Sequence, residues 1–268
     1  MLMPILQIHS EDVPPYAIVC GDPARAEKIS RKLDNARELA FSREYRTFVG
    51  AYEGVKIAVV SHGVGSPGAA VCFEELIRAG VKTLIRVGTA GSYTAEYPAG
   101  SVIVSTAAVR TDGLTRQLVP EGFPAVADSG VTEALYAAAL AGSAAHSAAG
   151  NAEPDQAVGS AEFTACKVGK GITVTLDAFF TGVEDIPHRK FKLAGALAAE
   201  MEIAALYIVS TLRGARAGAI VAIDGFADSD LAAEYDPHTN AVAAAVELEM
   251  EAALRALTHV ARQEEQGA

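Results

Sequence analysis

Six short runs of aliphatic and β-branched residues alternate with longer segments of helical composition, and this alternation restricts the fold more than any other feature of the chain. The runs span Tyr16–Cys20, Val55–Ser61, Thr83–Gly88, Ser101–Val109, Gly171–Thr175 and Gly218–Ile223. Continuous apolar strands of this kind are usually buried on both faces. The segments between them predict helices over Pro23–Leu33, Ser66–Ala79, Val131–Ala141, Ala194–Leu212 and from Pro237 to about Arg262. The alternation predicts an α/β fold in which helices cover a central sheet.

Two of the predicted helices begin at an Asp-Pro pair, Asp22–Pro23 and Asp236–Pro237. An aspartate before the first turn accepts a hydrogen bond from a helix N–H group, and proline within that turn already has the helical φ. Both pairs therefore predict helix starts.

The segment from Gly142 to about Ala165 differs from the rest of the chain. It is rich in Ala, Ser and Gly and has no hydrophobic period, so we predict an inserted surface loop of low complexity at about 142–165. Strands of the same type continue after it. We therefore expect one domain over residues 1–268.

The charge balance argues against binding to nucleic acid. The chain has 22 basic and 33 acidic side chains, a net charge of −11, and no clustered basic stretch. Its apolar runs are interrupted well before the ~20 residues that a membrane-spanning helix needs, and no signal peptide is apparent. The three cysteines, Cys20, Cys72 and Cys166, have neither disulfide nor metal-site spacing. These features predict a cytoplasmic protein that binds no metal and no membrane.

Arginine and glycine residues follow two of the predicted strands. In Gly21–Arg25 (GDPAR) a strand gives way to a helix, where glycine allows close approach of a ligand, helix N–H groups favour an anion and Arg25 adds a charge. The alternative is a capped helix with a solvated arginine. Arg86 lies within an apolar run before Thr89, and a buried guanidinium needs a compensating anion or carboxylate. A ligand anion and a structural salt bridge both satisfy this need.

The third segment is glycine-rich. In Ser61–Leu76 (SHGVGSPGAAVCFEEL) three glycines permit a close approach of the backbone, but they match neither a dinucleotide fingerprint nor a Walker sequence. We interpret His62 as a packed turn residue rather than a catalytic base.

Three carboxylates complete the set. Glu200 and Glu202 flank Met201 in a predicted apolar helix, so at least one of them needs a partner, either a sugar diol or a core arginine. Asp224 follows a fully apolar strand, where ligands bind in α/β folds and where a desolvated carboxyl could hold a proton. The alternative for Asp224 is a turn residue that bonds to its own backbone.

In order and separation these segments resemble the nucleoside phosphorylases of the hexameric purine and uridine type. The resemblance extends from about Val13 to Arg262 and is carried by Gly21–Arg25, Arg43–Phe48 (REYRTF), Ser61–Leu76, Arg86–Ser92, Gly122–Asp128 (GFPAVAD), Glu200–Glu202 and Ile223–Gly225. It implies a single α/β domain with a central mixed β-sheet flanked by helices. It further implies no cofactor, inorganic phosphate as co-substrate, and a homo-oligomer that is a dimer or a trimer of dimers.

The resemblance also assigns roles to individual residues. The implied phosphate site contains Gly21, Arg25, Arg86 and Thr89, with Arg43 donated by a neighbouring subunit. Met201 and Glu202 would bind ribose, and Phe179 would stack on the base beside Phe180 and Val64. Asp224 would share a proton with purine N7, while Arg86 would hold the phosphate that stabilises and captures a cationic sugar. We expect loss of Arg86 to cost more activity than loss of Asp224.

Two departures from the family pattern bear on the substrate. Thr181–Lys190 lacks the Gln-x-Arg pair of uridine-specific members in register, and Ile5 follows Pro4 where many members have a histidine, with His9 the nearest one. The leading hypothesis is phosphorolysis of a 6-oxopurine nucleoside to free base and ribose 1-phosphate, as in the similar protozoan enzymes. Uridine phosphorylase, methylthioadenosine phosphorylase and a nucleosidase that uses water remain alternatives, and a non-catalytic nucleotide-binding protein is the least favoured.

Overall fold

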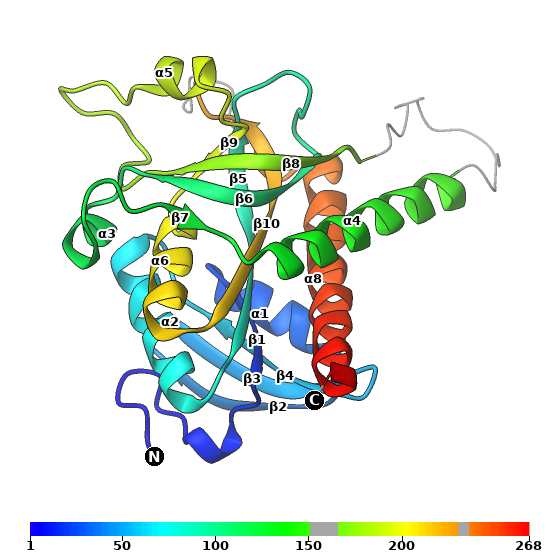
Figure 1. The fold of residues 1–268 in the computed structure, drawn as a ribbon. Helices are drawn as coiled ribbons and strands as arrows, with labels where there is room; N and C mark the ends of the chain where they lie inside the picture. Colours follow the sequence, from blue (N-terminus) through cyan, green and yellow to red (C-terminus); the bar gives the residue numbers. More distant parts are fainter. Residues whose placement is uncertain (151–165, 230–235, 268) are drawn as a thin grey trace.

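The predicted buried strands form the centre of one mixed sheet in the computed structural model, which describes residues 1–150, 166–229 and 236–267. Within these residues the strands are β1 (Tyr16–Cys20), β2 (Asp34–Ser42), β3 (Tyr45–Tyr52), β4 (Val55–Ser61), β5 (Thr83–Ser92), β6 (Val102–Arg110), β7 (Ala125–Val126), β8 (Val168–Thr175), β9 (Ala198–Glu200) and β10 (Arg216–Phe226). Their order is β10-β6-β8-β9-β5-β1-β4-β3-β2, and β7 pairs with β6 (Figure 1). The predicted α/β fold with a mixed sheet is confirmed.

Four parallel strands determine where a ligand can approach this sheet. β1 lies between β4 and β5 and is parallel to both, and β10 pairs in parallel with the other edge of β5. Because β10 also pairs with β6, the strands β5, β10, β6, β8 and β9 form a closed ring. The carboxyl ends of β1, β4, β5 and β10 therefore face the same edge, where α/β proteins bind their ligands.

Helices cover both faces of the sheet. The described helices are η1 (Ser10–Asp12), α1 (Pro23–Ser30), α2 (Ser66–Ala79), α3 (Gly113–Leu118), α4 (Ser129–Gly150), α5 (His188–Leu193), α6 (Ile203–Arg213) and α8 (Asn240–Gly267). In β1, Ala17 and Val19 pack with α2 and α6, whereas Ile18 and Cys20 pack with α1, α4 and α8. Figure 1 shows α6 and α8 on opposite sides of the sheet. Alternate side chains of a strand thus enter two different cores, which explains the continuous apolar runs.

Three sequence predictions are wrong in part. α4 continues to Gly150, so the first part of the predicted 142–165 loop is helical, in keeping with the high helix propensity of alanine; residues 151–165 lie outside the described part of the chain. The helix predicted over Ala194–Leu212 begins only at Ile203, after strand β9.

The last helix starts at Asn240 rather than Pro237. The side chain of Thr239 accepts a hydrogen bond from the Val242 N–H, while Asp236 accepts one from the His238 N–H in the preceding turn. Asp22, in contrast, caps α1 as predicted, with its Oδ1 2.8 Å from the Ala24 nitrogen.

The three cysteines are free thiols. Among the residues that the structure describes, no helix has the length and apolar character required to cross a membrane.

Candidate functional site

A cavity of about 1350 Å³ lies at the carboxyl ends of the parallel strands. We call it the strand-end cavity, and it is lined by the β1–α1 turn, the β4–α2 turn, the end of β5, the β9–α6 junction, the end of β10 and residues 176–188 in part. The predicted site residues that line it are Gly21, Arg25, Val64, Arg86, Thr89, Phe179, Phe180, Met201, Glu202 and Asp224. Residues separated by about 200 positions in the sequence therefore share one cavity. Arg43 is exposed in the β2–β3 turn and is not part of this lining.

The β1–α1 turn contributes Gly21 and Arg25. A Cβ atom at position 21 would lie 3.2 Å from the Gly63 carbonyl oxygen, so glycine allows the two strand-end turns to pack closely. Arg25 projects from the first turn of α1, and its Nη1 lies 3.2 Å from Oε1 of Glu249 on α8. Helix N–H groups and a cation thus lie at the same end of the cavity, an arrangement that favours an anion.

Arg86 lies in the interior of the protein with only 4% of its side chain exposed. Its Nη2 donates to Oε2 of Glu202, and its Nη1 lies 3.7 Å from Oε2 of Glu200. Among the buried side-chain atoms of the described residues, Arg86 Nε and Nη1 have no hydrogen-bond partner. The salt bridge that was the alternative to a ligand anion therefore exists, yet it leaves two nitrogens of the buried guanidinium without a hydrogen bond.

The backbone below Arg86 has no room for a side chain. At Gly88 a Cβ atom would lie 2.7 Å from Arg86 Cζ and 2.8 Å from its Nη2. These separations are far below ordinary contact, so the guanidinium packs directly on the glycine backbone. The orientation of Arg86 consequently depends on the absence of a side chain at position 88.

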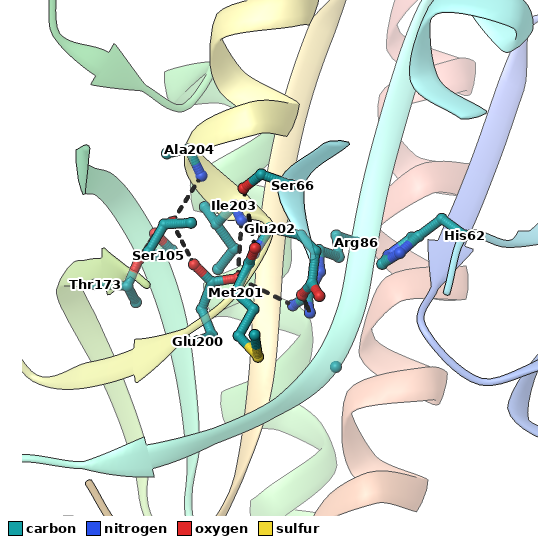
Figure 2. Close-up of polar contacts among 12 residues, drawn as sticks. His62, Ser66, Arg86, Ser105, Thr173, Glu200, Met201, Glu202, Ile203 and Ala204 are labelled. Carbon is teal, nitrogen blue, oxygen red and sulfur yellow. Dashed lines mark hydrogen bonds and ion pairs between the residues drawn. The ribbon is translucent and has the colours of Figure 1, made fainter. Parts of the chain in front are cut away.

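Glu200 and Glu202 reach Arg86 from the junction of β9 and α6, not from two faces of one helix as predicted (Figure 2). Glu200 ends the strand, and its Oε2 accepts hydrogen bonds from the Glu202 and Ile203 N–H groups at 2.7 and 2.8 Å. N–H groups at the start of a helix have no partner within the helix, and here the Glu200 carboxylate supplies one, which stabilises the change from β9 to α6. Met201 is thereby held between the two carboxylates.

The two carboxylates differ in their electrostatic environment. Burial raises the pKa of Glu200 to about 7, although Arg86 opposes the shift. Burial also acts on Glu202, but Arg86, His62 and the Gly65 N–H outweigh it and lower the pKa of Glu202. Glu202 is therefore the member of the pair that carries its negative charge over the wider pH range.

The glycine-rich turn between β4 and α2 supports Glu202. Gly63 and Gly65 have φ values of 74° and 95°, which glycine adopts without strain, and the Gly65 nitrogen lies 2.6 Å from Glu202 Oε1. His62 is fully buried, its Nδ1 lies 2.9 Å from the Gly63 carbonyl oxygen, and burial lowers its pKa to about 4. A neutral, packed turn histidine agrees with our interpretation of the sequence.

The lining of the cavity also includes aromatic rings and Asp224. Phe179 and Phe180 are 44% and 73% exposed, and their rings meet edge to face with centroids 5.0 Å apart. Asp224 is buried and occupies an irregularity in the pairing of β10 with β5, between the pairs Ile223–Ala90 and Gly225–Gly91. Such bulges redirect side chains beside functional sites.

Sequence reasoning missed several residues of the site. Glu44, Phe226 and His188 also line the cavity, and Glu249 contacts Arg25 from behind it. Phe226 lies only two residues after Asp224, so its place in the sequence could have indicated that it belongs to the site. Glu249, in contrast, comes from a helix far along the chain and has no local signal.

Comparison with known proteins identifies relatives over almost the whole chain. A sequence profile described as the Phosphorylase superfamily matches residues 15–262. A uridine phosphorylase from Thermococcus kodakarensis is 38% identical over an alignment of 229 residues, and the match covers 79% of this chain and 73% of the relative. A purine nucleoside phosphorylase from Plasmodium falciparum is 35% identical over an alignment of 223 residues, and the match covers 82% of each chain.

A solved structure gives the same result for the fold. Purine nucleoside phosphorylase from Toxoplasma gondii, crystallised in complex with immucillin-H, superimposes with a TM-score of 0.85 at 31% identity. The match covers 98% of this chain and 97% of the other.

Proposed function

This chain belongs to the phosphorylase superfamily as a nucleoside phosphorylase, and we propose that it cleaves 6-oxopurine nucleosides with inorganic phosphate to give the free base and ribose 1-phosphate. The single observation that carries this proposal is the buried Arg86, which lines the cavity, is paired with Glu202 and Glu200, and has two further nitrogens that make no hydrogen bond. A guanidinium in this state suits an anion that enters from the cavity.

The residues that line the cavity include the groups that such a reaction needs. Arg25 and Arg86 come from β1–α1 and β5, Glu202 is bonded to Arg86, and Phe179, Phe180 and Asp224 line the same cavity. Phosphate bound by the arginines, with Gly21 and Thr89, would lie below a ribose whose hydroxyls donate to Glu202. The Glu202 oxygens already accept from Gly65 and Arg86, and a carboxylate has acceptor sites left for hydroxyl groups.

Charge explains how this arrangement would catalyse the reaction. Cleavage of the N-glycosidic bond creates a cationic, oxocarbenium-like sugar, which a phosphate dianion below C1′ stabilises and then captures. The departing purine gains negative charge, and Asp224 would share a proton at N7 to relieve it. The chemistry proceeds through phosphate alone, with no cofactor.

The composition of the cavity lining favours a purine. Arg25 and Arg86 are the only arginines among the described lining residues, which include no glutamine, so no Gln-x-Arg pair for uracil is present among them. Asp224, in contrast, has a clear role only with a base that accepts a proton. Uridine phosphorolysis is the second candidate, because the relative from T. kodakarensis bears that name.

We further propose that the enzyme works as a homo-oligomer in which Arg43 completes the phosphate site of a neighbouring subunit. Arg43 is exposed, has a left-handed φ of 57° in a tight turn, and does not line the cavity of its own subunit. An exposed arginine in a tight turn is well placed to contact a neighbouring subunit.

The function is tested by incubating the protein with inosine, guanosine, uridine and methylthioadenosine, with and without phosphate, and identifying the sugar product. We expect ribose 1-phosphate from inosine and guanosine, and only when phosphate is present. Free ribose released without phosphate would instead identify a nucleosidase, and faster cleavage of uridine would identify the pyrimidine enzyme.

A further inference from the structure

Glu249 is a buried carboxylate that the reaction described above does not use. It lies in the middle of α8 with a side-chain exposure of 0%, although its neighbours Glu247 and Glu251 are about one-third exposed. Burying a carboxylate is costly unless it is paired and hydrogen-bonded, so a glutamate at this position requires a reason.

The contacts of Glu249 supply that reason. Its Oε1 lies 3.2 Å from Arg25 Nη1, and its Oε2 accepts hydrogen bonds from the Gly88 and Ala222 nitrogens at 3.2 and 3.0 Å. One carboxylate thus contacts three elements that line the cavity: α1 carries Arg25, β5 carries Arg86, and β10 carries Asp224. The pairing of β5 with β1 ends at Val87, one residue before Gly88, so Glu249 supports β5 where that neighbour is missing.

Both cavity arginines depend on these contacts. Glu249 holds Arg25 directly through the ion pair. Its effect on Arg86 is indirect: Glu249 accepts a hydrogen bond from the Gly88 N–H, and the guanidinium of Arg86 packs on the Gly88 backbone. The guanidinium of Arg25 has five N–H donors, of which this ion pair takes one, so it can be held in place and still present donors to the cavity.

We propose that Glu249 is a positioning residue for phosphate: it fixes the Arg25 guanidinium, and through the Gly88 backbone the place of Arg86, before the anion binds. The proposal rests on the proposed phosphorylase function. Glu249 is fully buried and is not among the described residues that line the cavity, so it would act through Arg25 rather than on the substrate. Burial, opposed by Arg25 and Arg86, also raises the pKa of this carboxyl to about 8, as expected for a group that lacks solvent.

The variant Glu249→Gln separates the two contacts. With its carbonyl oxygen in place of Oε2, glutamine still accepts the Gly88 and Ala222 N–H groups, but its NH₂ group then faces Arg25 Nη1, donor against donor. We expect the KM for phosphate to rise at least about tenfold, the range for loss of a charged hydrogen bond, with kcat and the nucleoside KM changed less than about threefold. Glu251→Gln is the matched control on the same helix and should leave all three constants unchanged.

A double-mutant cycle with Arg25→Ala distinguishes positioning from general damage. If Glu249 acts through Arg25, Arg25→Ala raises the phosphate KM strongly in the wild-type protein but little in the Glu249→Gln background. An unchanged phosphate KM in Glu249→Gln, or an equal effect of Arg25→Ala in both backgrounds, overturns the proposal. Isothermal titration with inorganic phosphate repeats the comparison without turnover, so it tests Glu249 even if no nucleoside is cleaved and the proposed function fails.

A second measurement applies if Glu249→Gln does not fold. Arg25→Met removes the cation that compensates Glu249 and keeps the carboxylate. Its melting temperature should fall further below wild type at about pH 9, where the carboxyl is ionised, than at about pH 6, where it is protonated. An equal loss at both pH values would show that the pair contributes nothing and would overturn the proposal.

Discussion

Replacing Gly88 with alanine should displace Arg86 without disturbing the backbone. The new Cβ atom would lie 2.7 Å from Arg86 Cζ, while ordinary contacts begin at 3.4 Å, so the guanidinium must retreat by at least about 0.7 Å. Arg86 is the flexible partner, but it is buried and bonded to Glu202, so the retreat weakens that ion pair. A misplacement approaching 1 Å in a catalytic group costs on the order of 10²-fold in rate, equivalent to about 2.7 kcal/mol in the activation barrier.

We therefore expect Gly88→Ala to lower kcat/KM for phosphate by about 10²-fold. The assay follows base release from inosine over a range of phosphate concentrations, and melting temperatures establish that both proteins are folded. Gly122→Ala is the control, because a Cβ atom at that position has no neighbour within 4 Å. If Gly88→Ala retains kcat/KM within about twofold of the wild type, the packing of Arg86 on Gly88 does not govern phosphate binding.

Three further predictions concern other groups of the site. Asp224→Asn should slow inosine cleavage by about 10²- to 10⁴-fold but should slow 7-methylinosine much less, because that base already carries the positive charge; equal losses with both nucleosides would exclude proton sharing at N7. The pKa of Glu249 is raised from 4.5 to about 8, so its stabilising contribution is complete below about pH 4.5 and is lost as the pH rises through 8. Calorimetry should therefore show the wild-type melting temperature falling more steeply between about pH 5 and 9 than that of Glu249→Gln, and parallel slopes would contradict this assignment. Mixing Arg43→Ala with Arg86→Ala subunits should restore activity through hybrid sites, and no recovery after verified subunit exchange would argue against a shared Arg43.

The fold could be predicted wherever both faces of an element are buried. β1, β4, β5 and β10 have continuous apolar runs because their alternate side chains enter two cores. β2 was missed for the opposite reason: most of its residues are exposed, so Asp34–Ser42 has no apolar pattern. The junction at Glu200 was missed because its residues have helical composition, and only the tertiary contacts of that carboxylate end the strand there.

The site was predictable to a similar extent. Arg86 and Asp224 stand out because charges occur within or directly after apolar strands. Glu249 does not stand out, since Glu247, Glu249 and Glu251 alternate in a helix that has the composition of a solvated face. Its burial follows from the position of α8 against β5 and β10, which no local pattern encodes.

The irregularity at Asp224 has a consequence for how such sites change. Sheet pairing resumes at Gly225 although one strand has used an additional residue, so the hydrogen-bonded ladder tolerates a length difference at this point. The loss or gain of one amino acid here would change which side chain occupies the position of Asp224 in the cavity lining, while the strands on either side stay paired. Changes in chain length, and not only replacements of side chains, can therefore alter which groups line the strand-end cavity.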